Sequence, residues 1–293
     1  MSKYRILLTG ASGFLGSHLL ESLLNKGYKV VILKRTTSSL WRIEHLLNKV
    51  KAYDADLRSL QNIFEEQSID CVIHTVCHYG RDRVETSVIL ESNLMLGLRL
   101  LDLALEYQVK TYINTDTLLP RNINAYALSK KQLVDWLEFY SNNIQVINIK
   151  LEHIYGPKDD STKFVYWVLS QFRENIPEIK LTLGEQKRDF TYIDDVVSAY
   201  LTILKNKDKL AGFNEFDIGS GKLISVREFI ENLKVLYEKK NGKKSITRLN
   251  FGQVPYREGE VMTVCVDNQP LLDLGWSPKT ILQDGLHNIL ETY

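Results

Sequence analysis

Apolar and polar positions alternate with two different periods through the first half of the chain. Short apolar runs of strand length, such as YRILLTG, are followed by longer stretches in which apolar residues recur every three or four positions. In the first of these stretches Leu15, Leu19 and Leu23 show the helical period, and Gly27 marks its end. Strands that alternate with amphipathic helices are typical of a parallel sheet covered by helices on both faces. We therefore predict an α/β fold with a doubly wound parallel sheet.

The regular alternation lasts as far as the strand-like run IQVINIKL and is lost beyond Gly156-Pro157. We expect a first domain over residues 1–155, with a returning segment near 186–205, and a smaller C-terminal lobe made mainly of residues 156–293. Within the first domain, helices are expected over 84–107 and 125–140.

Composition limits the partners. The 293 residues carry 37 basic and 36 acidic side chains, so no global charge favours a nucleic acid or an anionic membrane. Cys71, Cys77 and Cys265 are odd in number and form no CxxC motif, as expected of reduced cysteines. The apolar run after the N-terminus is too short for a signal peptide or a membrane span. These features predict a cytoplasmic protein with no membrane and no nucleic-acid partner.

A glycine-rich segment, TGASGFLG, lies directly between the first expected strand and the first expected helix. Glycine lets the backbone approach a pyrophosphate, and the helix N-terminus offers it unpaired N–H groups and a partial positive charge. A glycine turn without a ligand is the alternative, but the strand before and the helix after favour a dinucleotide. The residues expected to bind the cofactor here are Gly10, Ser12, Gly13, Phe14, Leu15 and Gly16.

The second expected strand ends in Lys34-Arg35, followed by a run of Thr and Ser. An acidic residue at this place binds the ribose hydroxyls of NAD, whereas a basic residue accepts the 2′-phosphate of NADP. Two cations with hydroxyl donors favour NADP, although both could simply be solvated at a strand end. Asp56 and Leu57, after the third strand, are expected near the adenine, with a plain turn as the alternative.

Tyr126 lies four residues before Lys130 in an expected helix, and Thr115 ends the strand before it. Positions i and i+4 share one helix face, so a phenol and an ammonium would lie side by side. A nearby positive charge favours phenolate and is expected to lower the pKa of Tyr126 from about 10. The pair could equally be an ordinary surface pair, and the other motifs must decide.

Several segments together resemble the extended short-chain dehydrogenase/reductases, the NAD-dependent epimerase/dehydratase family, which have a Rossmann-type fold. They are TGASGFLG, Thr115, YALSK, HIYGP, QKRDFTYIDDVVSAYL and PYREGEVMTVCVDNQPLLDLGWSPKT. The resemblance implies that Tyr126 exchanges a proton with a sugar carbonyl or alcohol, and that Thr115 hydrogen-bonds the same oxygen. It implies that Lys130 holds the nicotinamide ribose, so Tyr126 and Lys130 also contact the cofactor.

The segment NTDT resembles the Thr-Asp-Glu cluster of nucleotide-sugar 4,6-dehydratases. Asp116 stands at the acid position and would be a catalytic residue, but Thr117 replaces the Glu. Threonine cannot act as the carboxylate base, so dehydratase activity is not expected. With its short loop before Tyr126, the chain looks most similar to nucleotide-sugar 4-ketoreductases such as CDP-abequose and CDP-paratose synthases. The implied reaction is NADPH-dependent reduction of a 4-keto-6-deoxy or 3,6-dideoxy hexose, preferably CDP-linked, for surface polysaccharide synthesis.

A nucleotide-diphosphate sugar needs local positive charge. Arg188 and Arg257 match arginines that bind the diphosphate or nucleoside in related enzymes, with surface ion pairs as the alternative. His153 replaces the Asn usual in this family, so it either contacts the phosphate or packs. Arg81 follows the fourth strand, at the sheet edge where ligands bind.

The resemblance implies a homodimer formed through the helices over 84–107 and 125–140. A metal site is not expected, because His74 and His78 lie across a strand end rather than on one helix. Two other functions remain open. A nucleotide-sugar 4-epimerase would share the catalytic residues but hold NAD tightly, and a non-catalytic NADP-sensing protein would not need them.

Overall fold

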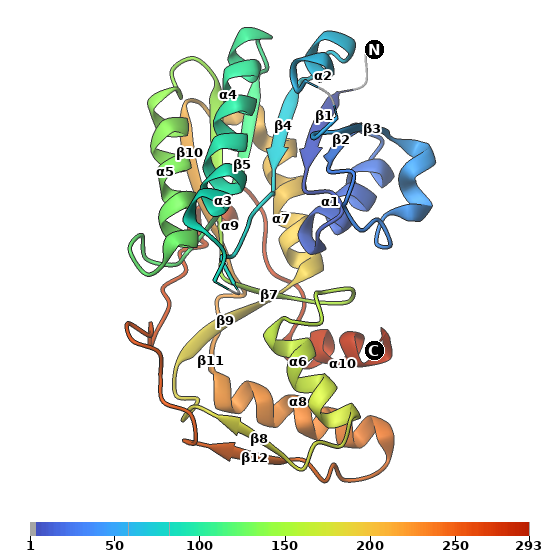
Figure 1. Cartoon of the computed structure of the whole chain (residues 1–293), viewed down its shortest axis with the longest axis vertical. Coiled ribbons are helices and arrows are strands. Elements are labelled where there is room, and N and C mark those ends of the chain that lie inside the picture. The colour runs from blue at the N-terminus through green and yellow to red at the C-terminus, as the bar shows by residue number, and fades with distance from the viewer. Residues whose placement is uncertain (1–3, 58, 82, 293) are drawn as a thin grey trace. The chain divides into compact units, whose positions relative to one another are not determined.

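The computed structural model describes residues 4–57, 59–81 and 83–292, which form two compact units (Figure 1). The first unit runs to Leu151 and takes in two later segments, Val197–Asp217 and Gln269–Trp276. The second contains Glu152–Val196, Ile218–Asn268 and the chain from Ser277. The chain first changes unit at 151–152, and its return begins inside a helix at Val197.

A seven-stranded sheet forms the centre of the first unit, in the order β10-β6-β5-β4-β1-β2-β3. All neighbouring strands among β1, β2, β3, β4, β5 and β6 pair in parallel. β10 lies at the edge of the sheet beside β6. From β1 the chain builds outward through β2 and β3, then crosses to the other side of β1 for β4, β5 and β6. The predicted doubly wound sheet is confirmed. The order in which the chain adds strands reverses between β1 and β4, although the two strands are parallel. The strands are β1 (Arg5–Thr9), β2 (Lys29–Lys34), β3 (Lys51–Asp54), β4 (Cys71–His74), β5 (Thr111–Thr117), β6 (Gln145–Leu151) and β10 (Phe213–Ile218).

Helices cover both faces of this sheet (Figure 1). They are α1 (Phe14–Asn25), α2 (Gln61–Glu66), α3 (Thr86–Leu90), α4 (Leu96–Glu106), α5 (Ala125–Phe139), α7 (Ile193–Asn206) and α9 (Gln269–Asp273). A π-helical turn, η2 (Glu91–Met95), joins α3 to α4, and two 3₁₀ turns are η1 (Glu44–Lys49) and η3 (Lys207–Lys209). The helices expected over 84–107 and 125–140 are confirmed, the former with this turn inside it.

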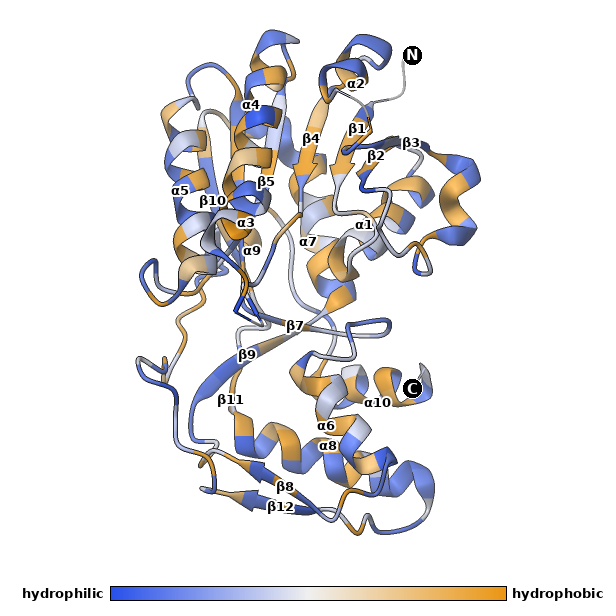
Figure 2. Ribbon diagram, viewed as in Figure 1, coloured by the Kyte–Doolittle hydropathy of each residue, from blue (hydrophilic) through white to orange (hydrophobic). Residues whose placement is uncertain are grey.

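Alternate residues of the central strands face opposite layers, as strand geometry requires. Leu7, Val72, Tyr112 and Val146 form one buried cluster with leucines of α4 and α5. Their neighbours along the same strands are also buried, so the strands are apolar on both faces (Figure 2). Each fully buried side chain of this size contributes about 1.5–3 kcal/mol. The carboxyl ends of β1, β4 and β5 are therefore held on a rigid layer.

The second unit packs helices on two small sheets. One sheet has the order β11-β9-β7, and β8 pairs with β12 in parallel. Phe190 and Phe229 stack in its core with their rings 3.8 Å apart. Asp189, fully buried, accepts backbone N–H groups of Ser220 and Gly221 at 2.7 and 2.8 Å and so fixes the turn before β11. The elements are β7 (His153–Tyr155), α6 (Phe164–Arg173), β8 (Glu178–Leu181), β9 (Lys187–Tyr192), β11 (Leu223–Ser225), α8 (Val226–Asn241), β12 (Arg248–Phe251) and α10 (Leu282–Thr292).

Within the described ranges, every helix is too short or too polar to span a membrane.

Candidate active site

The glycine segment lies where the sheet reverses direction, between β1 and α1. Gly10 has φ +75°, and a Cβ there would lie 2.5 Å from the Thr75 hydroxyl. A Cβ on Gly16 would lie 2.6 Å from the carbonyl carbon of Gly10. Both positions therefore require glycine. Gly13 caps α1 without any side-chain hydrogen bond, so the first turn keeps N–H groups for a ligand. This geometry fits the pyrophosphate of a dinucleotide.

The side chains around this loop differ in exposure. Ser12 and Phe14 are half-buried and Leu15 is buried. The guanidinium of Arg42 donates to the Ser12 carbonyl at 3.3 Å and lies over the Trp41 ring. Sequence reasoning missed Arg42, because only the fold brings this residue to the glycine loop.

The end of β2 has one paired and one unpaired cation. Lys34 forms an ion pair with Asp54, its register partner on β3. The guanidinium of Arg35 is exposed and has no partner in the described part of the chain. Of the two cations expected to bind a 2′-phosphate, only Arg35 is free to do so.

Asp56 and Leu57 follow β3. Asp56 accepts hydrogen bonds from the Thr36 hydroxyl and backbone N–H, and these lower its pKa. Leu57 is 70% exposed. Asp56 thus holds the loop after β2, while the Leu57 side chain stays open to a flat apolar ligand such as a purine.

Tyr126 and Lys130 lie on the first two turns of α5. The side chain of Asn124 caps this helix by accepting the Ala127 N–H at 2.8 Å, which sets where both residues fall. Lys130 is 1% exposed, and its Nζ has no hydrogen-bond partner among residues 4–57, 59–81 and 83–292. Burial lowers the pKa of Lys130. A buried ammonium needs acceptors, and ribose hydroxyls of a nicotinamide cofactor would supply them.

Tyr126 is covered by aromatic and polar neighbours. Its ring lies 5.0 Å from that of Tyr79, over which the Arg81 guanidinium lies at 5.5 Å. Burial raises the pKa of Tyr126, Cys77 and Asp116 raise it further, and a hydrogen bond with the Thr117 side chain acts in the opposite direction. The expected lowering of this pKa is wrong, because burial outweighs the other influences. Tyr126 is therefore protonated at neutral pH, as a proton donor must be.

Thr115 lies near the end of β5, half-buried. Its Oγ1 lies 2.7 Å from the phenol oxygen of Tyr200 on α7, and burial raises the pKa of Tyr200. The two hydroxyls share one hydrogen bond, so one of them keeps a proton for a further acceptor. Sequence reasoning missed Tyr200, although the residue lies in the quoted segment DDVVSAYL.

Asn93, in the π-helical turn, links the loop after β4 to α5. It is fully buried; its Oδ1 accepts the His78 N–H at 2.6 Å, and its Nδ2 donates to the Ser129 hydroxyl at 2.9 Å. Ser129 in turn donates to the Tyr126 carbonyl at 2.8 Å. Irregular turns of this kind are frequent at functional sites. The only sequence signal was a polar Asn among the mostly apolar residues of an expected helix.

Asp116 does not stand free. It is 2% exposed, and Lys131 on α5 forms an ion pair with it at 2.6 Å. The carboxylate expected to act as an acid is therefore held in a contact with Lys131, and its acid role stays a prediction.

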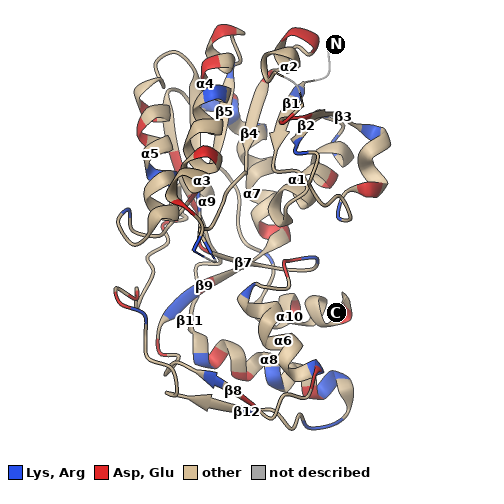
Figure 3. Ribbon diagram, viewed as in Figure 1, with Lys and Arg blue, Asp and Glu red and all other residues tan. Residues whose placement is uncertain are grey.

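The four expected substrate residues divide between the units. Arg81 belongs to the first unit, whereas His153, Arg188 and Arg257 belong to the second. Figure 3 colours the basic positions of β9 blue. One of them, Arg188, forms an ion pair with Glu260 at 2.5 Å and lies 3.7 Å from Glu152.

His153 shares the second of these carboxylates. Its Nδ1 lies 2.6 Å from Glu152, whose side chain is 3% exposed. Arg257 is exposed and its side chain has no partner in the described ranges, so its guanidinium is available to a ligand.

The two histidines named in the sequence have separate partners. His74 Nδ1 lies 2.8 Å from the Thr9 hydroxyl, and burial lowers the pKa of His74 to about 3. His78 Nδ1 accepts the Gly80 N–H at 3.1 Å. Among the residues described, no three His, Cys, Asp or Glu side chains gather as metal ligands.

A glycine loop between β1 and α1, with Thr115 near the end of β5 and Tyr126 and buried Lys130 on α5, is the residue set of an oxidoreductase of the short-chain dehydrogenase/reductase class. The sequence matches the NAD dependent epimerase/dehydratase family over residues 6–219. The chain belongs to this family of enzymes, whose cofactor is a nicotinamide dinucleotide.

Three known proteins are similar to this chain over nearly its whole length. The CDP-abequose synthase of Salmonella typhimurium is 32% identical, over 99% of this chain and 98% of its own length. The UDP-glucuronate 4-epimerase of Thermodesulfobacterium geofontis is 27% identical, over 96% of this chain and 93% of its own. A crystal structure of UDP-glucuronic acid 4-epimerase from Bacillus cereus with UDP-glucuronic acid and NAD shares the fold, with a TM-score of 0.82 at 24% identity over 98% of each chain.

Proposed function

We propose that the protein reduces the 4-keto group of a nucleotide-linked 6-deoxy or 3,6-dideoxy hexose with NADPH, and that the nucleotide is CDP. The observation that carries the proposal is Tyr126, a half-buried phenol whose pKa is raised and which hydrogen-bonds Thr117. A protonated phenol can give a proton to a developing alkoxide, and a threonine in place of a carboxylate base leaves elimination without its base. The similarity to CDP-abequose synthase supports the same choice.

The bound nicotinamide would supply the hydride to the carbonyl carbon. Tyr126 donates the proton to the carbonyl oxygen, and the Thr115–Tyr200 hydroxyl pair hydrogen-bonds that oxygen as its charge develops. Lys130 holds the ribose hydroxyls, which fixes the cofactor against the sugar. Tyr79 covers the ring of Tyr126 and limits the access of water.

The proposed preference for NADPH depends on Arg35. Its exposed guanidinium can bind a 2′-phosphate in a bidentate way. The Ser38 hydroxyl, which accepts the Arg35 backbone N–H at 3.0 Å, is a nearby donor. The Lys34–Asp54 ion pair removes Lys34 from this role and favours a second candidate, a 4-epimerase with tightly bound NAD. The 4-epimerase relative supports that candidate as well.

We also propose that the protein is a cytoplasmic homodimer serving surface polysaccharide synthesis. Apolar side chains are exposed on the helices expected to pair. Val88 is 45%, Trp136 47% and Phe139 71% exposed. Burying them against a second copy would remove apolar surface from water.

The test is consumption of NADPH, with NADH in parallel, in the presence of freshly made 4-keto-6-deoxy sugars linked to CDP, GDP or dTDP, and the CDP-linked 3-deoxy form. Loss of one NADPH per CDP-linked sugar reduced is expected. If no sugar causes NADPH loss and NAD copurifies with the protein, the epimerase candidate replaces the reductase.

A further inference from the structure

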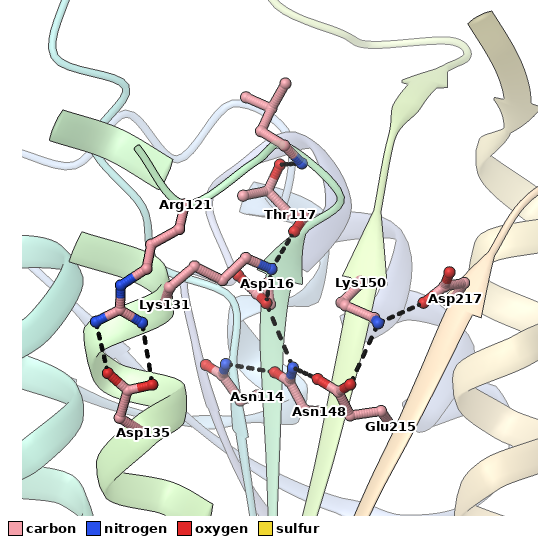
Figure 4. Close-up of polar contacts among 11 residues, drawn as sticks. Asn114, Asp116, Thr117, Arg121, Lys131, Asp135, Asn148, Lys150, Glu215 and Asp217 are labelled. Carbon is pink, nitrogen blue, oxygen red and sulfur yellow. Dashed lines mark hydrogen bonds and ion pairs between the residues drawn. The ribbon is translucent and has the colours of Figure 1, made fainter. Parts of the chain in front are cut away.

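Lys131 follows Lys130 on α5 but has a different environment. Its Nζ donates to Asp116 Oδ2 and to the Thr117 carbonyl, both at 2.6 Å, and its side chain is 20% exposed (Figure 4). One side chain of the helix therefore holds two successive residues at the end of β5. These contacts therefore connect β5, which carries Thr115, to α5, which carries Tyr126 and Lys130.

The ammonium of Lys131 neutralises the negative charge of Asp116. The Asp116 side chain is fully buried, and only Oδ2 has partners in the described part of the chain. Besides Lys131, Asn148 donates to Oδ2 at 3.3 Å. A buried carboxylate without a cation is costly, so the position of Asp116 depends on Lys131.

Further hydrogen bonds and ion pairs connect Asp116 to side chains on β6 and β10. Asn148 Nδ2 also donates to Glu215 on β10 at 2.8 Å, and Lys150 forms ion pairs with Glu215 at 3.2 Å and Asp217 at 3.0 Å. Figure 4 shows these side chains in one row across β5, β6 and β10. The row ties the end of β5 to its neighbours as well as to α5.

We propose that Lys131 is a positioning residue for the reduction: by holding Asp116 and the Thr117 carbonyl, it fixes the end of β5 against α5 and neutralises a negative charge beside Tyr126. This inference rests on the proposed function. Asp116 and Cys77 both disfavour the phenolate form of Tyr126, and Lys130 faces the same carboxylate. Without Lys131, the full charge of Asp116 would act on the proton donor.

A second ion pair on the same helix offers a matched control. Arg121, in the loop between β5 and α5, forms two hydrogen bonds with Asp135 at 3.1 and 2.7 Å. Both side chains are exposed, and this pair ties the loop after β5 to α5 without placing a charge beside Tyr126. Exposed pairs of this kind contribute little.

The experiment compares Lys131→Met, Arg121→Met and the double variant Asp116→Asn/Lys131→Met. We expect Lys131→Met to lower kcat about tenfold or more, with the KM for NADPH unchanged, and to move the alkaline limb of the pH profile upward. The double variant, which removes both charges, should recover the wild-type pH profile, and Arg121→Met should match the wild type throughout. If Lys131→Met has the wild-type kcat and pH profile, the proposal is wrong.

Amide hydrogen exchange separates this proposal from the proposed function. Lys131→Met should speed exchange in residues 115–119 about tenfold, and Arg121→Met should not. This result does not need turnover. Equal exchange in both variants would overturn the positioning role, whereas a wild-type protein that reduces no sugar would overturn the proposed function alone.

Discussion

Two pairs of adjacent basic residues, Lys34-Arg35 and Lys130-Lys131, are proposed to lie near the two ends of the cofactor. In each pair one residue is bound to an aspartate of the sheet: Lys131 on α5 to Asp116 on β5, and Lys34 at the end of β2 to Asp54 on β3. The other residue, Lys130 or Arg35, has no side-chain partner in the described chain. The arrangements are alike, but Lys130 is 1% exposed and Arg35 is open to water.

The difference shows how far an unpaired cation indicates a ligand. Water satisfies Arg35, so its lack of a partner costs little and says little. Lys130 is out of reach of water, so its ammonium is costly without acceptors. Buried Lys130 is therefore stronger evidence for a bound cofactor than exposed Arg35.

The largest effect is expected at Lys130. Lys130→Met should lower kcat by about 10²- to 10⁴-fold and weaken NADPH binding, because the ribose loses its cation. Steady-state kinetics together with cofactor titration by tryptophan fluorescence would measure both. Unchanged NADPH affinity would mean that the buried ammonium does not face the cofactor.

His74, buried near Lys130, extends the comparison to stability. Because its pKa falls to about 3 in the folded protein, the unfolded state binds the proton between pH 6.5 and pH 3 and stability falls in that range. At pH 4.5 protonation of His74 in the unfolded state lowers the free energy of unfolding by about 3 kcal/mol relative to pH 7.5. Urea unfolding at both pH values should show a smaller loss for His74→Asn, and an equal loss would show that His74 is protonated when folded.

Arg35 should affect cofactor choice and little else. Arg35→Ala should raise the KM for NADPH about tenfold, as expected for the loss of one charge-assisted contact, and leave the KM for NADH unchanged. Parallel kinetics with the two cofactors provide the internal control. An equal change for both would remove the basis for the NADPH preference.

The smallest effect is expected at Lys34. The Lys34–Asp54 pair is partly solvent-exposed, so Lys34→Met should change the free energy of unfolding by about 1 kcal/mol or less. Chemical denaturation would measure it. A loss several times larger would show that the pair is needed to hold β2 against β3.

Local pattern was enough to predict the sheet and the helix of Tyr126. Strand and helix periods differ, and the expected helix over 125–140 is observed as Ala125–Phe139 because Asn124 supplies the cap. The glycine segment was also readable, since it lies within one strand, turn and helix that follow one another in the sequence.

The contacts that decide charge and proton transfer were not readable. Thr115 meets Tyr200 from 85 positions away, and Lys34 meets Asp54 only through the register of β2 and β3. The pKa of Tyr126 is raised mainly by burial, and the spacing of Tyr126 and Lys130 in the sequence does not predict burial. The second unit gave few signals because its short strands lack a regular period.

The central claim is that hydride passes from NADPH to C4 of the sugar while Tyr126 supplies the proton. Deuterated NADPH, labelled on the transferred position, tests it directly with the CDP-linked 4-keto sugar and mass spectrometry. The account predicts a 4-hydroxy product carrying one deuterium, with the same amount of NADPH oxidised, and none of this product with Tyr126→Phe. An unlabelled product formed without loss of NADPH would contradict it.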